Sequence, residues 1–139
     1  MSSYVEKFQV TVLREQHTDR VLSIRYEDDQ GNLHRTGGLP ALEVVDPSTS
    51  RLVIQQFAEH GAEHRAGGQP SYVESDPDTG KVLVVRWQER GIARLNGAAI
   101  VYRDPSTGEV VEAFRQEGDK LIALHVCAED RLDMDEPSP

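Results

Sequence analysis

The sequence predicts an all-β protein, an antiparallel meander of about eight strands built from about four hairpin repeats that form an elongated twisted sheet. A closed or half-closed barrel is the alternative. Two observations predict this fold class: glycines recur at intervals of 30, 30 and 27 residues, and Asp-Pro pairs recur at intervals of 30 and 28. Such self-similarity is typical of repeats that bury their apolar sides against one another. The anchors are Gly31, Gly61, Gly91 and Gly118, with Asp46, Asp76 and Asp104.

Each unit begins with an apolar run that its composition assigns to a β-strand. The runs RLVIQQF, KVLVVRW and EVVEAF are rich in Val, Ile and aromatic residues, which favour strands. Phe57, Trp87 and Phe114 close these runs four residues before the glycine, and Tyr26 takes the same place one residue out of register. We expect these rings to form a ladder in the core, each covering the next.

A polar connector, a shorter strand and a turn complete each unit. The shorter strands are ALEVVD, SYVESD and AIVYRD, and the turns PSTS, PDTG and PSTG follow them. In Asp-Pro-x-Thr-Gly the aspartate caps nearby N–H groups, the proline presets φ, and the glycine supplies a positive φ. Ser50 replaces this glycine in the first copy, which predicts a strained or differently shaped turn.

The two ends of the chain extend the pattern. FQVTVLRE and RVLSIRYEDDQG read as the strands of a degenerate first hairpin joined by QHTD, and KLIALHVC adds one more strand or a short helix. The tail AEDRLDMDEPSP is acidic and ends in Pro-Ser-Pro, a composition typical of disorder. The sequence therefore predicts one β-repeat domain over residues 1–127, with units at about 8–31, 31–61, 61–91 and 91–118, and a disordered tail over 128–139.

Alternation within KVLVVRW places apolar groups on both faces of the sheet. Leu83, Val85 and Trp87 point to one face. Val82 and Val84 point to the other. Because a sheet with one wet face alternates more cleanly, we expect the middle of the array to be covered on both faces, by curling or by a second chain.

Composition limits the classes of partner and compartment. The net charge of −9, from 24 acidic and 15 basic residues, argues against nucleic acid and favours solubility or a basic partner. The single cysteine, Cys127, excludes an internal disulfide and fits a reducing, cytoplasmic compartment. No signal peptide is visible, and the longest apolar run, LIAL, is too short to cross a membrane.

The connectors resemble a bacterial and phage repeat written H-R-x-x-G-P-A, which is related to MORN-type β-hairpin repeats. The first copy, HRTGGLPA, matches it with Leu39 inserted before the proline, and the second, HRAGGQPS, ends in Ser71. The third, ARLNGAA, has Ala93 and Ala98 in place of the histidine and the proline. The resemblance covers roughly residues 20–118. The resemblance implies a hairpin-repeat fold and a role as an interaction module. Proteins with such repeats include proposed antitoxin or immunity components, and the resemblance implies no enzymatic activity.

The conspicuous polar and aromatic residues of the repeat are candidates for a binding site. Histidine titrates near neutral pH, so His34 and His64 could ligate a metal or act as acid–base groups. Ala93 replaces the third histidine, however, and no carboxylate or cysteine recurs beside the histidines at ligand spacing. The favoured interpretation is structural: the histidines pack over the neighbouring hairpin, and the arginines bond carboxylates or backbone carbonyls. No catalytic residue, metal or cofactor is predicted. The candidates are His34, Arg35, His64, Arg65, Arg94 and Trp87.

Three hypotheses about function follow. The leading one is a non-enzymatic module that binds another protein, because a regular sheet offers a broad face and open edges for strand addition. The acidic balance favours a second, an immunity or antitoxin protein that covers a basic toxin. The third is a small metal-dependent or histidine-dependent hydrolase that uses His34 and His64. A homo-oligomer is a further option.

Overall fold

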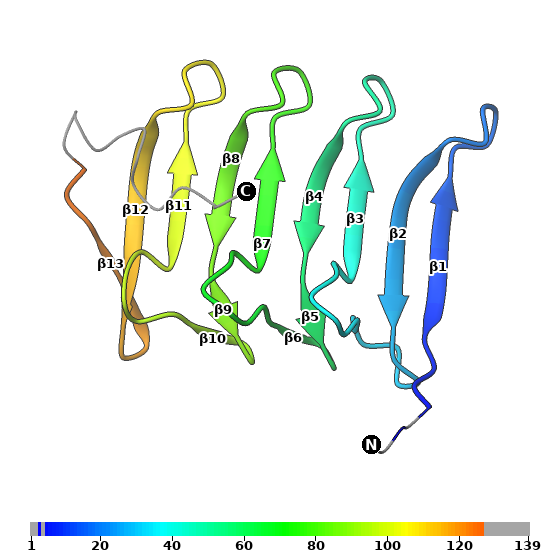
Figure 1. Ribbon diagram of the computed structural model, residues 1–139. Helices are drawn as coiled ribbons and strands as arrows, with labels where there is room; N and C mark the ends of the chain where they lie inside the picture. Colours follow the sequence, from blue (N-terminus) through cyan, green and yellow to red (C-terminus); the bar gives the residue numbers. More distant parts are fainter. Residues whose placement is uncertain (1–2, 4, 127–139) are drawn as a thin grey trace.

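Every regular element of the chain is a β-strand in the computed structural model, which describes residue 3 and residues 5–126 (Figure 1). Nine antiparallel strands form one sheet in the order β1-β2-β3-β4-β7-β8-β11-β12-β13. The all-β, elongated sheet is confirmed; β1 and β13 lie at opposite edges without pairing, so the barrel alternative is wrong. The nine are β1 (Gln9–Arg14), β2 (Val21–Glu27), β3 (Leu42–Val45), β4 (Leu52–Gln56), β7 (Tyr72–Ser75), β8 (Val82–Arg86), β11 (Ile100–Arg103), β12 (Val110–Glu117) and β13 (Lys120–Ala123).

Four hairpins follow one another along the sheet, with their turns at one end and their connectors at the other (Figure 1). The hairpins are β1–β2, β3–β4, β7–β8 and β11–β12. The degenerate first hairpin and the additional strand in KLIALHVC, β13, are therefore confirmed. Two short ribbons continue the strands beyond the main sheet: β5 (Ala58–Glu59) pairs with β6 (Ala62–Glu63), and β9 (Gln88–Glu89) with β10 (Ile92–Ala93). The predicted tail over 128–139 lies outside the described residues.

The Asp-Pro turns share one geometry. The Asp76 carboxylate accepts the backbone N–H groups of Asp78 and Thr79 at 3.1 and 2.7 Å, and the Asp46 and Asp104 carboxylates accept the equivalent pairs. The last N–H of each turn, from Ser50, Gly80 or Gly108, donates to the aspartate carbonyl at 2.8 Å. Ser50 keeps this geometry at φ 62°, so the turn is strained rather than differently shaped.

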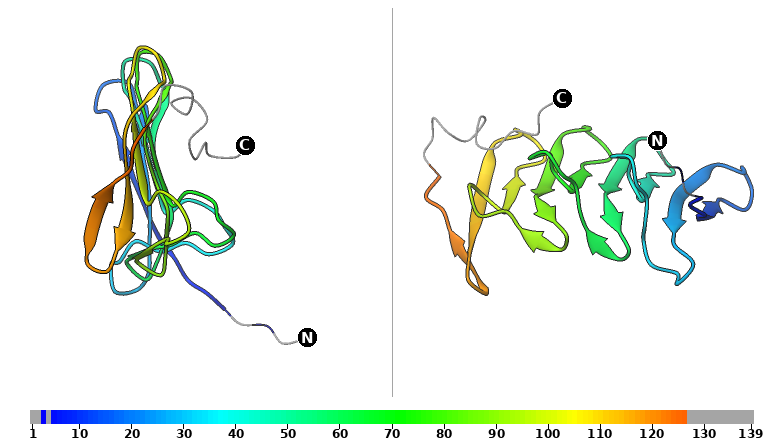
Figure 2. Two further views of the ribbon diagram at one scale, coloured as in Figure 1. Left: turned by 90° about the vertical axis from the view of Figure 1, so that its left-hand side faces the viewer. Right: turned by 60° about the horizontal axis from the view of Figure 1, so that its bottom comes forward.

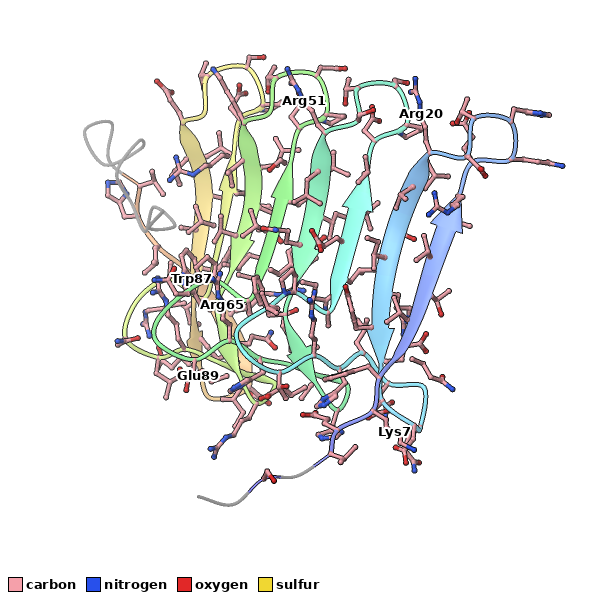
Figure 3. All side chains as sticks on the ribbon, turned by 45° about the vertical axis from the view of Figure 1, so that its right-hand side comes forward. Lys7, Arg20, Arg51, Arg65, Trp87 and Glu89 are labelled. Atoms are coloured by element: carbon pink, nitrogen blue, oxygen red, sulfur yellow. The ribbon has the colours of Figure 1, made fainter. Side chains whose placement is uncertain are left out.

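Basic side chains tie each turn to the next one. Arg20 donates to the Pro47 carbonyl at 2.8 Å, Arg51 to the Asp78 carbonyl at 2.6 Å, and Lys81 to the Ser106 carbonyl at 2.7 Å. Each cation directly follows the last residue of its own turn: Arg20 follows Asp19, Arg51 follows Ser50, and Lys81 follows Gly80. Figure 3 shows Arg20 and Arg51 along the turn edge of the sheet. These bonds fix the register between neighbouring hairpins.

The main sheet is a single layer, and its two faces are covered unequally (Figure 2). Face A carries the fully buried Val85, Val101 and Ala113, which lie opposite one another on β8, β11 and β12. Leu124 and Val126 pack against this cluster. Among the described elements, curling covers neither face, so that part of the expectation is wrong, whereas coverage by a second chain stays a prediction. Face B carries Val44, Ile54, Glu74, Val84 and Tyr102 in one cross-strand row.

Replacing Ser50 with glycine should stabilise the protein by about 1 kcal/mol, because glycine adopts a positive φ without the Cβ clash. The matched control is Gly80→Ser, which introduces the same strain into the next turn and should cost a similar amount. Urea denaturation of the three proteins measures both changes. Equal stability of the native chain and Ser50→Gly would contradict the assignment of strain to this turn.

Candidate binding surface

Each connector crosses the aromatic residue at the end of its hairpin and covers it with an arginine. The guanidinium carbon of Arg35 lies 3.9 Å from the ring centre of Tyr26. Arg65 lies 4.0 Å from that of Phe57, and Arg94 lies 3.9 Å from that of Trp87. Stacking of this kind joins cation–π attraction to the packing of a planar side chain. Phe57 and Trp87 are buried, as predicted, whereas Tyr26 is half-buried, and an arginine rather than the next ring covers each of the three.

The same arginines close their own connectors by bonding backbone carbonyls. Arg35 donates to Pro40 at 3.3 Å, and Arg65 donates to Pro70 at 3.2 Å. Burial lowers the pKa of Arg65 below its ordinary value. In the third copy Arg94 donates to the Ala98 carbonyl at 2.7 Å. The predicted bond to backbone carbonyls is therefore present in all three copies.

Phe114 departs from the predicted ladder. It pairs with Ile100 on face B and makes an edge contact with Tyr102, at 6.2 Å between ring centres. Trp87 lies on face A beside Val85 and is 3% exposed. Counted from the Asp-Pro turn, Phe114 takes the position of Arg86 and not of Trp87, because the last unit is shorter. The shorter interval of 27 residues between Gly91 and Gly118 was the sequence signal for this change of face.

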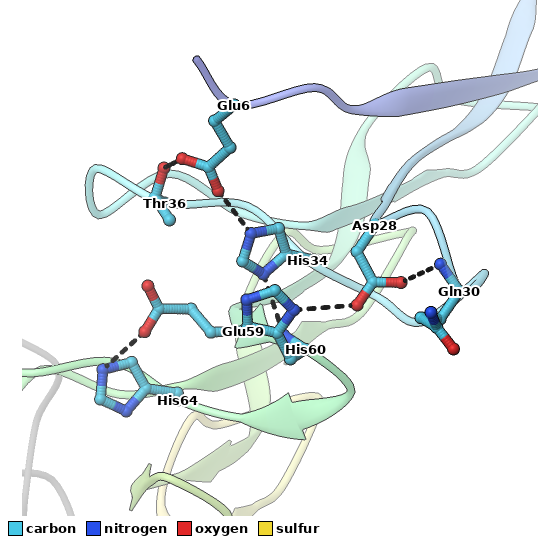
Figure 4. A network of polar contacts seen from close by, with 8 residues as sticks. All are labelled: Glu6, Asp28, Gln30, His34, Thr36, Glu59, His60 and His64. Atoms are coloured by element: carbon cyan, nitrogen blue, oxygen red, sulfur yellow. Dashed lines mark hydrogen bonds and ion pairs between the residues drawn. The ribbon is translucent and has the colours of Figure 1, made fainter. Parts of the chain in front are cut away.

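Each of the two connector histidines bonds the turn of the next short ribbon, β5–β6 or β9–β10, and Figure 4 shows His34 beside His60. His34 Nδ1 accepts the backbone N–H of His60 at 2.9 Å, and His64 Nδ1 accepts that of Arg90 at 2.8 Å. The donors sit at φ 48° and 53° in tight two-residue turns. Nε2 of His34 contacts Glu6 at 2.6 Å. Packing over the neighbouring hairpin is thus what both rings do, and Nδ1, as an acceptor, carries no proton.

Sequence reasoning missed the acidic partners of this histidine group. His60 stacks on His34 with ring centres 3.9 Å apart and contacts Asp28 at 3.0 Å. Burial raises the pKa of the Asp28 carboxyl, but bonds from His60 and from the N–H groups of Asn32 and Gln30 outweigh burial and bring its pKa to about 2. The Asp-x-x-Gly spacing before Gly31 was a turn signal, whereas nothing in the repeat announces Glu6, which lies before the first strand.

A partly buried ion pair anchors the middle connector. Glu63, directly before His64, receives two bonds from Arg86 of β8, at 2.8 and 2.6 Å, and one from the Ser71 hydroxyl at 2.9 Å. This pairing raises the pKa of Arg86. Arg86 also lies over the ring of Tyr72, whose pKa rises to about 12 through burial and a bond to Glu74. The pair occurs once, so the repeat pattern did not reveal it.

Two equivalent grooves lie between successive connectors. The first has a volume of about 420 Å³ and brings together Arg35, His64 and Arg65. The second, of about 600 Å³, brings together Arg65, Trp87 and Arg94, and Figure 3 shows Arg65, Trp87 and Glu89 gathered there. His34 lines a separate hollow with Lys7, Asp28, Asp29 and His60.

The structure does not bring the two histidines of the hydrolase hypothesis together. The third hypothesis needs His34 and His64 at one site, and they line different hollows. Within residues 5–126 no group of three or more His, Cys, Asp or Glu side chains could hold a metal ion. In the same part of the chain, no helix long and apolar enough to cross a membrane occurs.

Comparison with protein-family models, with curated proteins and with solved structures found no match for this chain. The resemblance to H-R-x-x-G-P-A repeats therefore stays a prediction from the sequence.

Glu63→Gln should destabilise the protein by about 2 kcal/mol, because Arg86 then keeps its charge without a carboxylate in a largely buried position. Partial exposure of Arg86 keeps the cost below that of a fully buried pair. Glu112→Gln, at an exposed position of β12, is the matched control and should change stability little. Chemical denaturation measures both; equal effects would contradict the anchoring role.

Stability should decrease as the pH falls from about 4 to about 2 in a way that depends on Asp28. Its lowered pKa means that the ionised carboxylate stabilises the folded state above its ordinary pKa, and this contribution is lost on protonation. Asp28→Asn should therefore be less stable than the native chain at pH 7, with a gap that closes near pH 2. Thermal unfolding across this range tests it, with exposed Asp29→Asn as control; a pH-independent gap would contradict the assignment.

Proposed function

We propose that the chain is a non-enzymatic protein-binding module that contacts its partner through the two grooves between the connectors. The observation that carries this proposal is the presence of the same groove in adjacent repeats. One repeat advances the sheet by two strands, about 10 Å, and three residues of extended polypeptide also span about 10 Å. A polypeptide segment laid across the connectors can therefore enter both grooves, which favours such a ligand over a compact small molecule.

The groove rims combine cationic and apolar side chains. Arg65 lines both grooves, Leu39 lines the first, and Ile92 and Leu95 line the second. Ile92 and Leu95 are 68% and 73% exposed, which is unusual for large aliphatic side chains. Arginine and apolar side chains at the centre of a contact are typical of protein–protein interfaces. This chemistry favours a partner segment with apolar side chains, joined by carboxylates that the arginines attract.

The double variant Ile92→Asp, Leu95→Asp should lose its partner, because it places two charges in the apolar part of the second groove. The native chain and the variant are each immobilised and incubated with lysate of the cells that make the protein. We expect the native chain to enrich a partner protein and the variant to capture at least about tenfold less of it. Leu121→Asp is the control, since Leu121 is also an exposed aliphatic residue, at 54%, but lies on β13. Mass spectrometry identifies the captured protein.

Equal capture by all three proteins would contradict binding at the grooves, and no specific capture by the native chain would contradict the module itself. A second function, an immunity or antitoxin protein against a basic toxin, is favoured by the net charge of −9. Under that function the captured protein is basic, its binding weakens steeply with salt, and the groove variant binds it as well as the native chain does.

A further inference from the structure

We propose that two copies of this chain join through their β1 strands into a two-fold symmetric dimer with one continuous sheet. This inference stands apart from the proposed function, because β1 contributes no residue to either groove. It rests on the exposure of β1, on the direction of its backbone groups and on the order of its side chains.

The β1 edge lacks most of the usual protection against pairing. Every residue of Gln9–Arg14 is exposed, and the strand contains neither lysine nor proline; its charged residue, Arg14, and its β-bulge lie at the turn end. Val10, Val12 and Leu13 are 51%, 41% and 56% exposed, so apolar groups stand open on both faces of this edge. Natural sheets blunt free edges with short strands, charge or proline, as the opposite edge does with four residues that begin at Lys120.

The backbone groups of β1 that point outward can be identified from its neighbour. Tyr26 donates its N–H to Ala41 at 2.8 Å and accepts from His34 at 3.0 Å, so both of its groups point away from β1. Val10 lies opposite Tyr26. In an antiparallel ladder such a pair shares no hydrogen bonds, and the alternation repeats every second residue. The N–H and C=O groups of Val10 and Val12 therefore point to the open edge.

The segment around β1 is complementary to itself. It reads KFQVTVLRE over residues 7–15, with Thr11 at its centre. Antiparallel pairing about a two-fold axis at Thr11 places Val10 opposite Val12 of the second copy, so that their outward groups bond each other. The same register places Lys7 opposite Glu15 of the second copy. Symmetry makes each pairing occur twice, and no like charges face one another.

Neighbouring registers lose this complementarity. A shift by one residue would place the side chains of face A opposite those of face B, which a continuous sheet does not allow. A shift by two residues keeps the faces but sets Lys7 opposite Leu13 or His17 instead of Glu15. The first of these shifts also sets Glu6 opposite Arg14, but Glu6 is already bonded to His34 and Thr36 of its own chain. Opposite charges across strands favour pairing and like charges oppose it, so the register at Thr11 is the one that the side chains select.

Sedimentation of the full native chain at micromolar concentration and low salt should show a dimer. Lys7→Glu and Glu15→Lys should each raise the dimer dissociation constant about tenfold, because each creates two like-charge contacts. The first substitution makes the negative net charge larger and the second makes it smaller, so general repulsion predicts opposite effects. The double variant restores both pairs and should return the dissociation constant close to that of the native chain.

Val12→Pro provides a test of the backbone pairing. It removes an outward N–H that the chain's own β1–β2 ladder does not use, so circular dichroism should stay unchanged while the dimer is lost. A native chain that is monomeric throughout the micromolar range would overturn the proposal, as would a dimer that the single charge reversals and Val12→Pro leave intact. A dimer that forms through another face would be insensitive to these substitutions.

Discussion

Polar bonds from each hairpin to the next hold together a sheet that has little core. At the turn edge, basic side chains such as Arg51 donate to carbonyls of the following turn, and at the connector edge His34 and His64 accept N–H groups from the following hairpin. A single layer cannot bury both of its faces, so apolar burial by itself would leave the order and register of the hairpins weakly specified. Bonds at both strand ends specify them, and the sequence repeats because the bonds repeat.

The connector arginines cover aromatic rings that a single-layer sheet leaves open on one face. Aromatic residues at the strand ends would face solvent, since no second sheet of the described residues packs on them. An arginine placed seven to nine residues later, as Arg65 is after Phe57, covers the ring while its charged atoms keep carbonyl and solvent contacts. Each unit thus carries its own cover, and the connector that delivers the arginine also forms the wall of a groove.

Sequence reasoning reached the features that recur and missed those that occur once. The hairpins, the Asp-Pro turns and the structural use of His34 and His64 repeat, so spacing revealed them. Glu63 with Arg86 belongs to one unit, and its pairing depends on how a connector folds against a strand far away in the sequence. Phe114 shows the limit of anchoring on glycine: a unit three residues shorter turned the ring to the other face. The cations after the turns were visible, but their bonds across hairpins were not.

The two proposals are geometrically compatible, and together they imply a bivalent assembly. A two-fold axis through Thr11 perpendicular to the sheet keeps face A of both copies on the same side, whereas the antiparallel strands send their connectors to opposite ends. The grooves of the two copies would then open on one side of a continuous sheet, at opposite ends of the strands and with at least β1, β2 and β3 of each copy between them. A partner with two suitable segments would gain effective concentration from such an arrangement, provided that its segments are far enough apart to reach both ends.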